Sequence, residues 1–318
     1  MRAVVYERFG PPGVLEVRDV PAPRCGPADV RVRVRAVAIN PKDALERKGR
    51  VRWATFHRRP PYRVGYDFAG EVAEVGRDVR DVAVGDRVFG MRQGFRAGAA
   101  AEELTARNGE YARIPDGVGY EDACAVPLAG QTALQGLRDV GRLRSGQRVC
   151  IHGASGGVGL LAVQIARILG AVITTTSGLA SFDLLRELGS DDAVTYEGHP
   201  VLRRAGAFDV FLDVHGNVGY RRAREALAPG GTYVSTIPGR PILVDTLRTL
   251  AGGQRARLVL VRSNAVDLAL LGGWLAGAEG SSLRVVKDLV LDGLESMAAA
   301  QGRIETRHAH GKIVLRVA

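Results

Sequence analysis

A glycine-rich turn that joins an apolar strand to an apolar helix constrains the fold of this chain more than any other feature. The segment RVCIHGASGGVGLLAVQIARILGAVITTT, residues 148–176, places Gly157, Gly159 and Ala162 in the spacing G-x-G-x-x-A. Glycines at such a turn let the backbone approach a pyrophosphate, and the free N–H groups at the helix N-terminus stabilise its negative charge. The segment therefore predicts a dinucleotide-binding turn, whose contact residues are Ser155, Gly156, Gly157, Val158 and Gly159.

Two hydrophobic patterns divide the chain. Up to about Pro115, period-two runs such as DVRVRVRAVAI and EVAEVG lie between Gly, Pro and Asp, which indicates short antiparallel strands in a barrel-like unit. From about Gly119, strands alternate with helices, which indicates a doubly wound parallel sheet. The expected helices cover 159–169, 182–188 and about 221–228. The last strand, GKIVLRV, is expected to return to the first unit. We predict an α/β chain with one domain built from 1–118 and 265–318 and a second from 119–264.

The end of the second strand of the parallel sheet indicates which nucleotide binds. Sites for NAD place Asp or Glu about 20 residues after the turn, where the carboxylate accepts hydrogen bonds from the ribose 2′-OH. Here the strand ends in Thr175, Thr176 and Ser177. Hydroxyl groups can donate to a 2′-phosphate, which a carboxylate would repel. The cofactor is therefore predicted to be NADPH, with Thr176 and Ser177 among its contacts.

Composition limits the class of protein. The chain has 318 residues, of which 46% are hydrophobic and 25% charged, as in soluble globular proteins. The longest nearly apolar stretch, 268–278, is shorter than the roughly 20 residues of a membrane helix, and the N-terminus has no apolar signal region. Cys25, Cys124 and Cys150 are too few and too scattered for a disulfide framework. We predict a cytoplasmic protein.

The net charge of +10 is spread along the chain, and its densest basic cluster lies at residues 46–63. A solvated loop is the favoured interpretation of this cluster, and an anion-contacting loop beside the active site is the alternative. Nucleic-acid binding is not favoured, because no recognition helix or RNA-binding signature accompanies the cluster.

Several motifs, together with the glycine turn, resemble one family. They are GYDFAGEVAEVG (65–76), VGDRVFGM (84–91), VPLAGQTALQGL (126–137) and HGKIVLRV (310–317). In this order they resemble the zinc-independent quinone oxidoreductase branch of the medium-chain dehydrogenase/reductase superfamily, over nearly the whole chain. The resemblance implies a GroES-like β-barrel catalytic domain, a Rossmann NADP-binding domain, an active site in the cleft between them, and a homodimer.

The zinc-dependent relatives in this superfamily hold a catalytic zinc with a Cys and with the His of a G-H-E motif. In this chain INPKD places Asn40 at the position of the Cys, and GYD places Tyr66 and Asp67 at the positions of the His and Glu. No metal is therefore expected at this site. His308 and His310 form an H-x-H pair that lacks a third ligand, so we expect them to be solvated.

Without a Lewis acid, reduction favours acceptors that are electrophilic by conjugation, namely quinones and α,β-unsaturated carbonyl compounds. The reaction would transfer hydride from the nicotinamide, and hydrogen-bond donors would stabilise the resulting oxyanion. Asn40 is the first candidate for holding the nicotinamide amide or the substrate oxygen, and Lys42, Tyr66 and Tyr62 are further donors. The alternative is that Asn40 and Asp43 only shape the local turn.

The resemblance also implies contacts for four further residues. Thr132 would lie beside the nicotinamide, Tyr196 would contact the 2′-phosphate, and Ile237 would lie under the nicotinamide ring. Lys312 belongs to the C-terminal motif and is placed among the cofactor contacts. A basic residue that the family often carries after the second strand is replaced at 179–181 by Leu, Ala and Ser, which weakens the expected preference for NADPH.

Two other functions remain open at this point. One is an enoyl-thioester reductase in lipid or polyketide assembly, for which the basic cluster at 46–63 could receive an anionic carrier. The other is a noncatalytic relative that binds NADPH or RNA.

Overall fold

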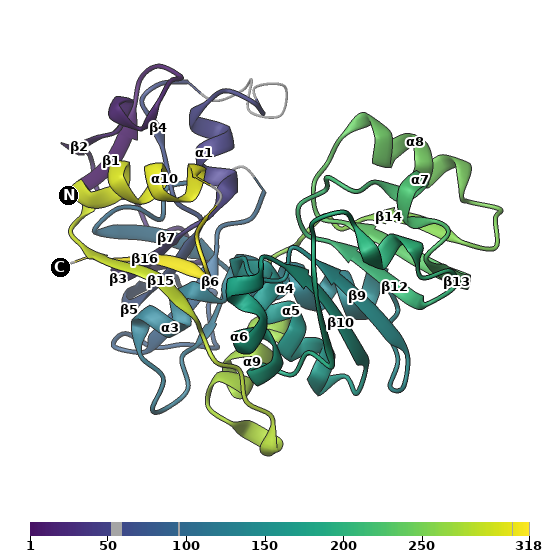
Figure 1. The fold of residues 1–318 in the computed structure, drawn as a ribbon. Helices are drawn as coiled ribbons and strands as arrows, with labels where there is room; N and C mark the ends of the chain where they lie inside the picture. Colours follow the sequence, from purple (N-terminus) through teal and green to yellow (C-terminus); the bar gives the residue numbers. More distant parts are fainter. Residues whose placement is uncertain (52–58, 95, 307, 318) are drawn as a thin grey trace. The chain divides into compact units, whose positions relative to one another are not determined.

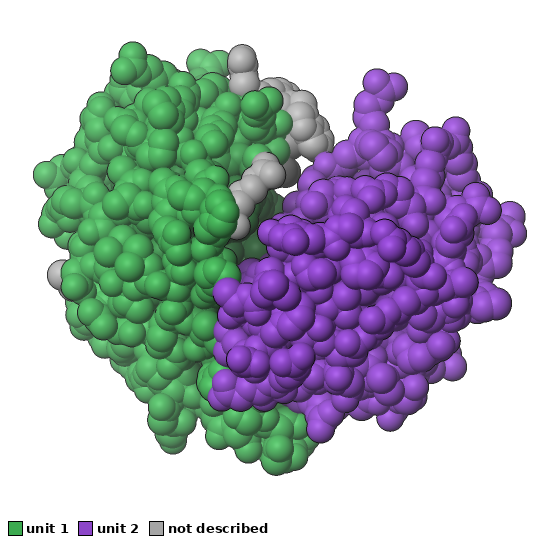
Figure 2. All heavy atoms as spheres, viewed as in Figure 1, with its two compact units in different colours: residues 1–128, 262–318 green, residues 129–261 purple. Residues whose placement is uncertain are grey.

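The computed structural model describes residues 1–51, 59–94, 96–306 and 308–317, and the chain divides into two compact units. Unit 1 comprises 1–128 and 262–318, and unit 2 comprises 129–261 (Figure 2). The sequence placed the first junction near 118. Helix α3 (Tyr120–Ala125) packs on strands β3 (Asp29–Ile39) and β5 (Asp67–Val75) and so lies with unit 1.

Unit 1 contains two β-sheets (Figure 1). The smaller is antiparallel in the order β2-β1-β4, with β1 (Arg2–Tyr6), β2 (Glu16–Asp19) and β4 (Tyr62–Arg63). The larger has the order β15-β16-β3-β5-β6-β8, and β7 pairs with β3. Its further strands are β6 (Arg87–Met91), β7 (Glu103–Arg107), β8 (Tyr111–Arg113), β15 (Lys287–Asp292) and β16 (Lys312–Arg316). In the described part of the unit, the longer helices are α1 (Pro41–Arg47), α3, α9 (Ala265–Leu275) and α10 (Met297–Glu305).

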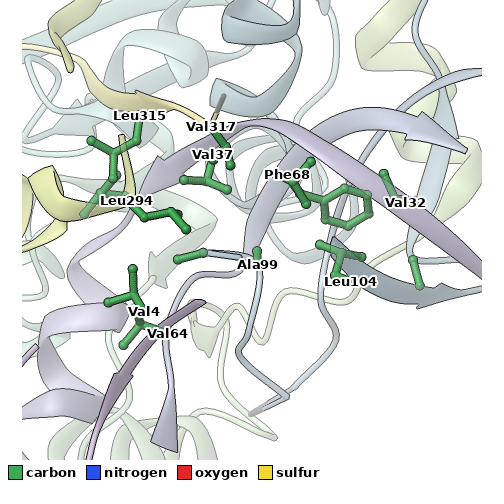
Figure 3. Close-up of a cluster of buried hydrophobic side chains, with 14 of the residues drawn as sticks. Val4, Val32, Val37, Val64, Phe68, Ala99, Leu104, Leu294, Leu315 and Val317 are labelled. Atoms are coloured by element: carbon green, nitrogen blue, oxygen red, sulfur yellow. The ribbon is translucent and has the colours of Figure 1, made fainter. Parts of the chain in front are cut away.

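The alternating pattern of β3 explains the larger sheet. Its valines at every second position are buried, and the arginines between them are more exposed. In Figure 3, Val32 and Val37 of β3 lie in the same apolar cluster as Phe68, Leu104 and Leu315, which come from three other strands. The period of two places Val32 and Val34 in this core, as the sequence predicted, and a shift of register between Val34 and Ala36 brings Val37 to the same cluster.

The C-terminal strand β16 pairs with β3 antiparallel, joining Ile313 to Ile39 and Leu315 to Val37. The last segment of the chain therefore belongs to the sheet of unit 1, although most of unit 1 precedes unit 2 in the sequence.

Unit 2 is a six-stranded parallel sheet in the order β11-β10-β9-β12-β13-β14. Its strands are β9 (Arg148–His152), β10 (Val172–Ser177), β11 (Asp192–Thr195), β12 (Phe208–Asp213), β13 (Leu227–Ser235) and β14 (Arg255–Leu258). Its helical segments are α5 (Gly157–Ile168), α6 (Phe182–Glu187), η4 (Pro200–Arg203), α7 (Tyr220–Ala223) and α8 (Arg240–Arg248), while α4 (Pro127–Leu134) begins in unit 1. The strand order reverses between β9 and β12, which is the Rossmann arrangement that the sequence predicted.

One expected helix is shorter than the sequence suggested. Residues 221–228 were expected to be helical, but α7 ends at Ala223 and β13 begins at Leu227. Leu227 pairs with Phe208 of β12 and is buried beside it. The neighbouring strand and the apolar core therefore override the helical pattern.

None of the helices in the described part of the chain is long and apolar enough to cross a membrane.

Candidate functional site

The glycine turn predicted from the sequence connects β9 to α5. A Cβ on Gly159 would lie 2.4 Å from the carbonyl oxygen of Gly153 and 2.6 Å from Cα of Ala154. Only glycine lets the first turn of α5 pack so closely on the preceding backbone. A Cβ on Gly156 would meet nothing nearer than the Gly153 oxygen at 3.9 Å. Since Gly156 is not needed for packing within the protein, its missing side chain leaves room for a ligand.

Helix α5 has 12 residues and begins with Gly156 as its N-cap, without a capping side chain among the described residues. The N–H groups of its first turn are therefore available to an anion, which the helix dipole also favours. The turn thus fits the pyrophosphate of a dinucleotide, and the residues that would hold it are Ser155, Gly156, Gly157, Val158 and Gly159.

Further predicted contact residues lie at the same edge of the sheet. Thr176 and Ser177 are the last residues of β10, Tyr196 follows β11, and Ile237 follows β13. Because these strands are parallel neighbours in one sheet, their carboxyl ends lie along a single edge with the glycine turn. Tyr196 and Ile237 are 50% and 43% exposed, so both side chains are accessible to a ligand.

The hydroxyl groups at the end of β10 are not accessible. Thr176 is fully buried, and its Oγ1 lies 2.6 Å from Nδ1 of His152. Ser177 is also buried, and its hydroxyl donates to the carbonyl of Gly178 at 3.0 Å. The structure therefore gives both hydroxyls partners within the protein, whereas the sequence suggested that they face the 2′-phosphate.

His152 links three segments at this edge. Its Nε2 lies 3.0 Å from Oδ1 of Asn217, an acceptor, so Nε2 carries the proton and Nδ1 accepts from the Thr176 hydroxyl. Burial lowers the pKa of the His152 imidazole, which keeps it neutral near pH 7. The rings of His199 and His215 lie 6.3 and 6.4 Å from that of His152, between ring centroids.

A buried carboxylate shapes the loop after β12. Asp213 accepts hydrogen bonds from the backbone N–H groups of Gly216 at 2.7 Å and Val218 at 2.9 Å. It also accepts from the hydroxyl of Tyr233 at 2.7 Å. Burial and this carboxylate raise the pKa of Tyr233 well above its ordinary value, so the phenol stays protonated. These bonds fix the loop that carries Asn217 and His215.

In unit 1, Asn40, which stands at the position of the family's cysteine ligand, belongs to a buried polar network with Asp67 and Lys312. Nδ2 of Asn40 donates to Asp67 at 2.9 Å, and the ammonium of Lys312 donates to Oδ1 of Asn40 at 2.7 Å. Lys312 also lies 3.4 Å from Oδ2 of Asp67. The Asp67 carboxylate accepts a further bond from the N–H of Leu128 at 2.9 Å. Burial raises the pKa of Asp67, and the Lys312 ammonium opposes this effect.

Asp43 forms the turn at the start of α1. Its carboxylate accepts the backbone N–H of Asn40 at 2.8 Å and that of Gly65 at 3.1 Å. Burial, reinforced by the carboxylates of Glu46 and Asp67, raises the pKa of Asp43 to about 7. The alternative role suggested by the sequence, shaping the local turn, therefore describes Asp43 well.

Tyr66 and Lys42 lie next to this network. Tyr66 is fully buried and its hydroxyl donates to Glu46, which is itself 4% exposed. The Nζ of Lys42 lies 3.7 Å from the centre of the Tyr66 ring and donates to the carbonyl of Gly94. Of the predicted catalytic residues, Asn40 and Tyr66 are buried, and Lys42 is partly exposed.

These residues do not fit a zinc ion. Zinc in proteins is held by thiolate, imidazole or carboxylate groups, but positions 40 and 66 carry an amide and a phenol. An ammonium group, that of Lys312, lies between Asn40 and Asp67. In the described ranges, no three His, Cys, Asp or Glu side chains lie close enough together to hold a metal ion.

Thr132, the predicted neighbour of the nicotinamide, is buried in α4.

The basic cluster at 46–63 was interpreted as a solvated loop, but Glu46 and Arg47 are buried in α1. The Arg47 guanidinium donates to Oε1 of Gln301 at 2.6 Å and pairs with Glu305. The centre of the cluster, 52–58, lies outside the described residues, so the anion-contact alternative there stays a prediction.

Sequence reasoning missed His152, Asp213 and Glu46 as polar residues of these sites. His152 precedes the glycine turn directly and ends a buried strand. That position was a usable signal, because the last residue of a parallel strand lies at the ligand-binding edge. The tyrosine partners of Asp213 and Glu46, namely Tyr233 and Tyr66, each lie 20 positions away, so no local pattern identified these two bonds.

Comparisons with known proteins agree with both units. A domain model described as alcohol dehydrogenase GroES-like domain matches residues 26–129, and one described as zinc-binding dehydrogenase matches residues 157–264. The solved structure of the quinone oxidoreductase from Coxiella burnetii has a TM-score of 0.90 at 31% identity, covering 100% of this chain and 99% of that one.

Two curated sequences show the same relationship. A quinone oxidoreductase of Pseudomonas aeruginosa is 34% identical over 243 residues, which are 74% of this chain and 72% of that protein. The spectinabilin polyketide synthase system protein NorB of Streptomyces orinoci is 34% identical over 334 residues. That match covers 97% of this chain but 14% of NorB.

Proposed function

Since this chain belongs to the zinc-type alcohol dehydrogenase-like medium-chain dehydrogenase/reductase superfamily and is an oxidoreductase of that family, we propose that it is a zinc-independent, NADPH-dependent reductase of quinones or α,β-unsaturated carbonyl compounds. The observation that carries the proposal is the network of Asn40, Asp67 and Lys312, in which an ammonium group donates to Asn40, the residue at the position of the family's cysteine ligand, and lies 3.4 Å from the Asp67 carboxylate. Acceptors that need no metal to become electrophilic suit such a site.

The nicotinamide, when bound, supplies the hydride. The glycine turn and the uncapped start of α5 would hold the pyrophosphate, with Gly156 leaving the space for it. Ile237 is the accessible apolar side chain after β13 that would lie against the nicotinamide ring. Thr132 and Lys312 stay proposed contacts from the resemblance.

Lys42 is the residue we assign to the substrate oxygen. Hydride addition to a quinone or to the β-carbon of an enone leaves an oxyanion, which a cationic donor stabilises and then protonates. Asn40 and Tyr66 are buried, whereas Lys42, which donates to the carbonyl of Gly94, is partly exposed beside the Tyr66 ring. We therefore give Asn40 and Tyr66 the role of positioning α1 and the Lys42 side chain.

An NADPH-oxidation screen tests this function. Purified protein is given quinones, alkenals, enones, enoyl-CoA thioesters, saturated aldehydes and alcohols, with and without a zinc chelator. Turnover of quinones or free enones that the chelator does not change supports the proposal. Activity that requires zinc, or that is confined to saturated aldehydes and alcohols, contradicts it. Failure with every acceptor, together with salt-sensitive RNA binding, would favour a noncatalytic relative.

The role of Lys42 has a matched control in Lys48, which lies at the end of α1 and pairs with Glu305 at the surface. Lys42→Met should lower kcat by about tenfold to a hundredfold, as expected for losing one donor to an oxyanion, while NADPH affinity is unchanged. Lys42→Arg should recover part of the rate. Lys48→Met should behave as wild type, and equal effects of the two Met variants would contradict the assignment.

A second candidate, an enoyl-thioester reductase, is favoured by the match to the polyketide synthase protein NorB over 97% of this chain. Reduction of enoyl-CoA thioesters without reduction of any free enone in the same screen would select this function. Reduction of both classes would leave the broader enone reductase as the better description.

We also propose that the protein is a cytoplasmic homodimer. Its three cysteines are free thiols, as suits a reducing compartment. Strand β14 is an edge of the unit 2 sheet, and three nearby side chains are exposed, namely Leu243, Leu247 and Leu250. Light scattering on a gel-filtration column tests the dimer, and a monomer mass at high protein concentration would contradict it.

A further inference from the structure

The hydroxyl groups at the end of β10 do not account for discrimination between NADPH and NADH. The hydroxyl of Thr176 is bonded to His152 at 2.6 Å and that of Ser177 to the Gly178 carbonyl at 3.0 Å. Both residues are buried. Rotating either hydroxyl towards a phosphate would break an internal bond, so recognition of the 2′-phosphate must come from a neighbouring segment of the same sheet edge.

The neighbouring segment is residues 196–203, which follows β11 and which we call the β11–η4 turn. Its first residue continues the pairing with β10, because the N–H of Tyr196 donates to the carbonyl of Ser177 at 3.1 Å. The Tyr196 ring lies beside Gly178, where an added Cβ would be 3.7 Å from its Cε1. The exposed phenol therefore lies at the end of β10, where the adenosine ribose binds in this fold.

The β11–η4 turn also brings a guanidinium to this place. Its chain reverses between Tyr196 and His199, whose N–H donates to the Tyr196 carbonyl at 3.1 Å. Nη2 of Arg203 donates back to the carbonyl of Gly198, inside that reversal, at 3.3 Å. Val201, two residues before Arg203 in η4, is 1% exposed and packs in the core of unit 2, which anchors this segment.

Among the residues that the structure describes, no carboxylate neutralises the charge of Arg203. No carboxylate in the described ranges lies within ion-pair distance of Arg203, while the adjacent Arg204 pairs with Asp192. Glu197 is the one acidic residue of the β11–η4 turn. The Arg203 guanidinium lies at the carbonyl of Gly198, in the same turn as the exposed Tyr196. A guanidinium and a phenol suit a phosphate, because both donate hydrogen bonds and the guanidinium adds charge.

We propose that Arg203, together with Tyr196, binds the 2′-phosphate of NADPH and determines the preference of this chain for NADPH over NADH. The inference rests on the proposed function, and it moves the specificity determinant from β10 to the β11–η4 turn. Arg203 supplies the positive charge that the sequence around 179–181 lacks.

The test measures nucleotide binding directly by titration calorimetry, without turnover. The probes are adenosine 2′,5′-bisphosphate, which carries the 2′-phosphate, and 5′-AMP, which does not. In Arg203→Ala, the affinity for the bisphosphate should fall by about tenfold to a hundredfold, the loss expected for removing a hydrogen-bonding partner of a charged group, while the affinity for 5′-AMP should not change. Arg203→Lys should recover part of the affinity.

Two control variants separate this inference from the sequence-based one. Arg204→Ala removes the same charge from the adjacent position and should leave both affinities unchanged. Ser177→Ala removes the hydroxyl that the sequence suggested and should also leave them unchanged. The same variants assayed with NADPH and NADH should show that only Arg203→Ala loses kcat/KM with NADPH.

The outcomes separate failure of the Arg203 proposal from failure of the proposed reductase function. If wild type binds the bisphosphate and Arg203→Ala binds it equally well, or if Arg203→Ala loses 5′-AMP to the same extent, the inference is wrong and the proposed reductase stands. If wild type binds neither nucleotide nor NADPH, the proposed function itself is wrong. A loss confined to Ser177→Ala would return the specificity determinant to β10.

Discussion

The ammonium of Lys312 is predicted to stabilise unit 1 by compensating the buried carboxylate of Asp67. Lys312 is 5% exposed, Asp67 is 0% exposed, and the two groups share Asn40 as a partner. Lys312→Met keeps the length of the side chain and removes the charge. Breaking a buried ion pair by removing one partner costs about 3–5 kcal/mol, because the remaining charge stays buried without compensation.

The cost should depend on pH in a defined direction. Burial already raises the pKa of Asp67, and loss of the ammonium raises it further. A carboxyl whose pKa is raised in the folded state contributes stability that is present below its unfolded value of about 3.9 and is lost as the pH rises through the folded value. The cost should be smaller at about pH 5.5 than at about pH 8, because a lower pH favours protonation of the Asp67 carboxyl in the variant, and a neutral carboxyl leaves only the roughly 1–2 kcal/mol of a lost hydrogen bond. At about pH 8 the full cost should appear, with a slope of no more than about 1.4 kcal/mol per pH unit.

Equilibrium urea unfolding measures this effect in unit 1 alone. The chain has two tryptophans, Trp53 and Trp274, and both belong to the sequence of unit 1, so tryptophan fluorescence follows that unit. The double variant Asp67→Asn/Lys312→Met should lose most of the pH dependence, because the carboxyl is gone. A cost below about 1 kcal/mol at pH 8, or a cost equal at both pH values, would refute the assignment of Lys312 as the compensating charge.

Three other substitutions test the sites described above. Gly159→Ala should lower the affinity for adenosine 2′,5′-bisphosphate at least about tenfold, since its Cβ would lie 2.4 Å from the Gly153 oxygen; unchanged binding in calorimetry would show that the turn adapts. The pKa of Asp43 is raised to about 7, so its contribution to stability is present below about pH 4 and is lost as the pH rises towards 7. Asp43→Asn should therefore flatten the pH dependence of urea unfolding between about pH 4 and 7. Identical profiles for wild type and variant would mean that Asp43 does not titrate in that range. His152→Phe leaves the buried hydroxyl of Thr176 without its partner and should cost about 1–3 kcal/mol of stability in unit 2, read by circular dichroism; a neutral effect would mean that the hydroxyl finds another acceptor.

Much of the fold could be predicted because its signals are local. The glycine spacing, the strand before it and the helix after it lie within residues 148–176 and specify a Rossmann turn without any distant partner. The alternation in β3 likewise identified a half-buried antiparallel strand. The expected helix at 221–228 was wrong in its second half, because Leu227 is held as a strand by Phe208 of β12.

The sites depended more on partners that are distant along the chain. Sequence proposed Thr176 and Ser177 as phosphate donors because of their residue type, but their hydroxyls are bonded to His152 and Gly178. Their orientation follows from the neighbouring strand and the local backbone, which residue type does not reveal.

Short, continuous patterns encode the two-part architecture, the dinucleotide turn and the residue types at the metal-ligand positions, so these could be predicted without a structure. Three contacts could not: Lys312 with Asp67, Arg47 with Gln301, and Arg203 with the carbonyl of Gly198. The first two contacts join residues 245 and 254 positions apart. A hydrogen bond or ion pair requires approach within a few ångströms, and folding, not local pattern, sets which side chains achieve it.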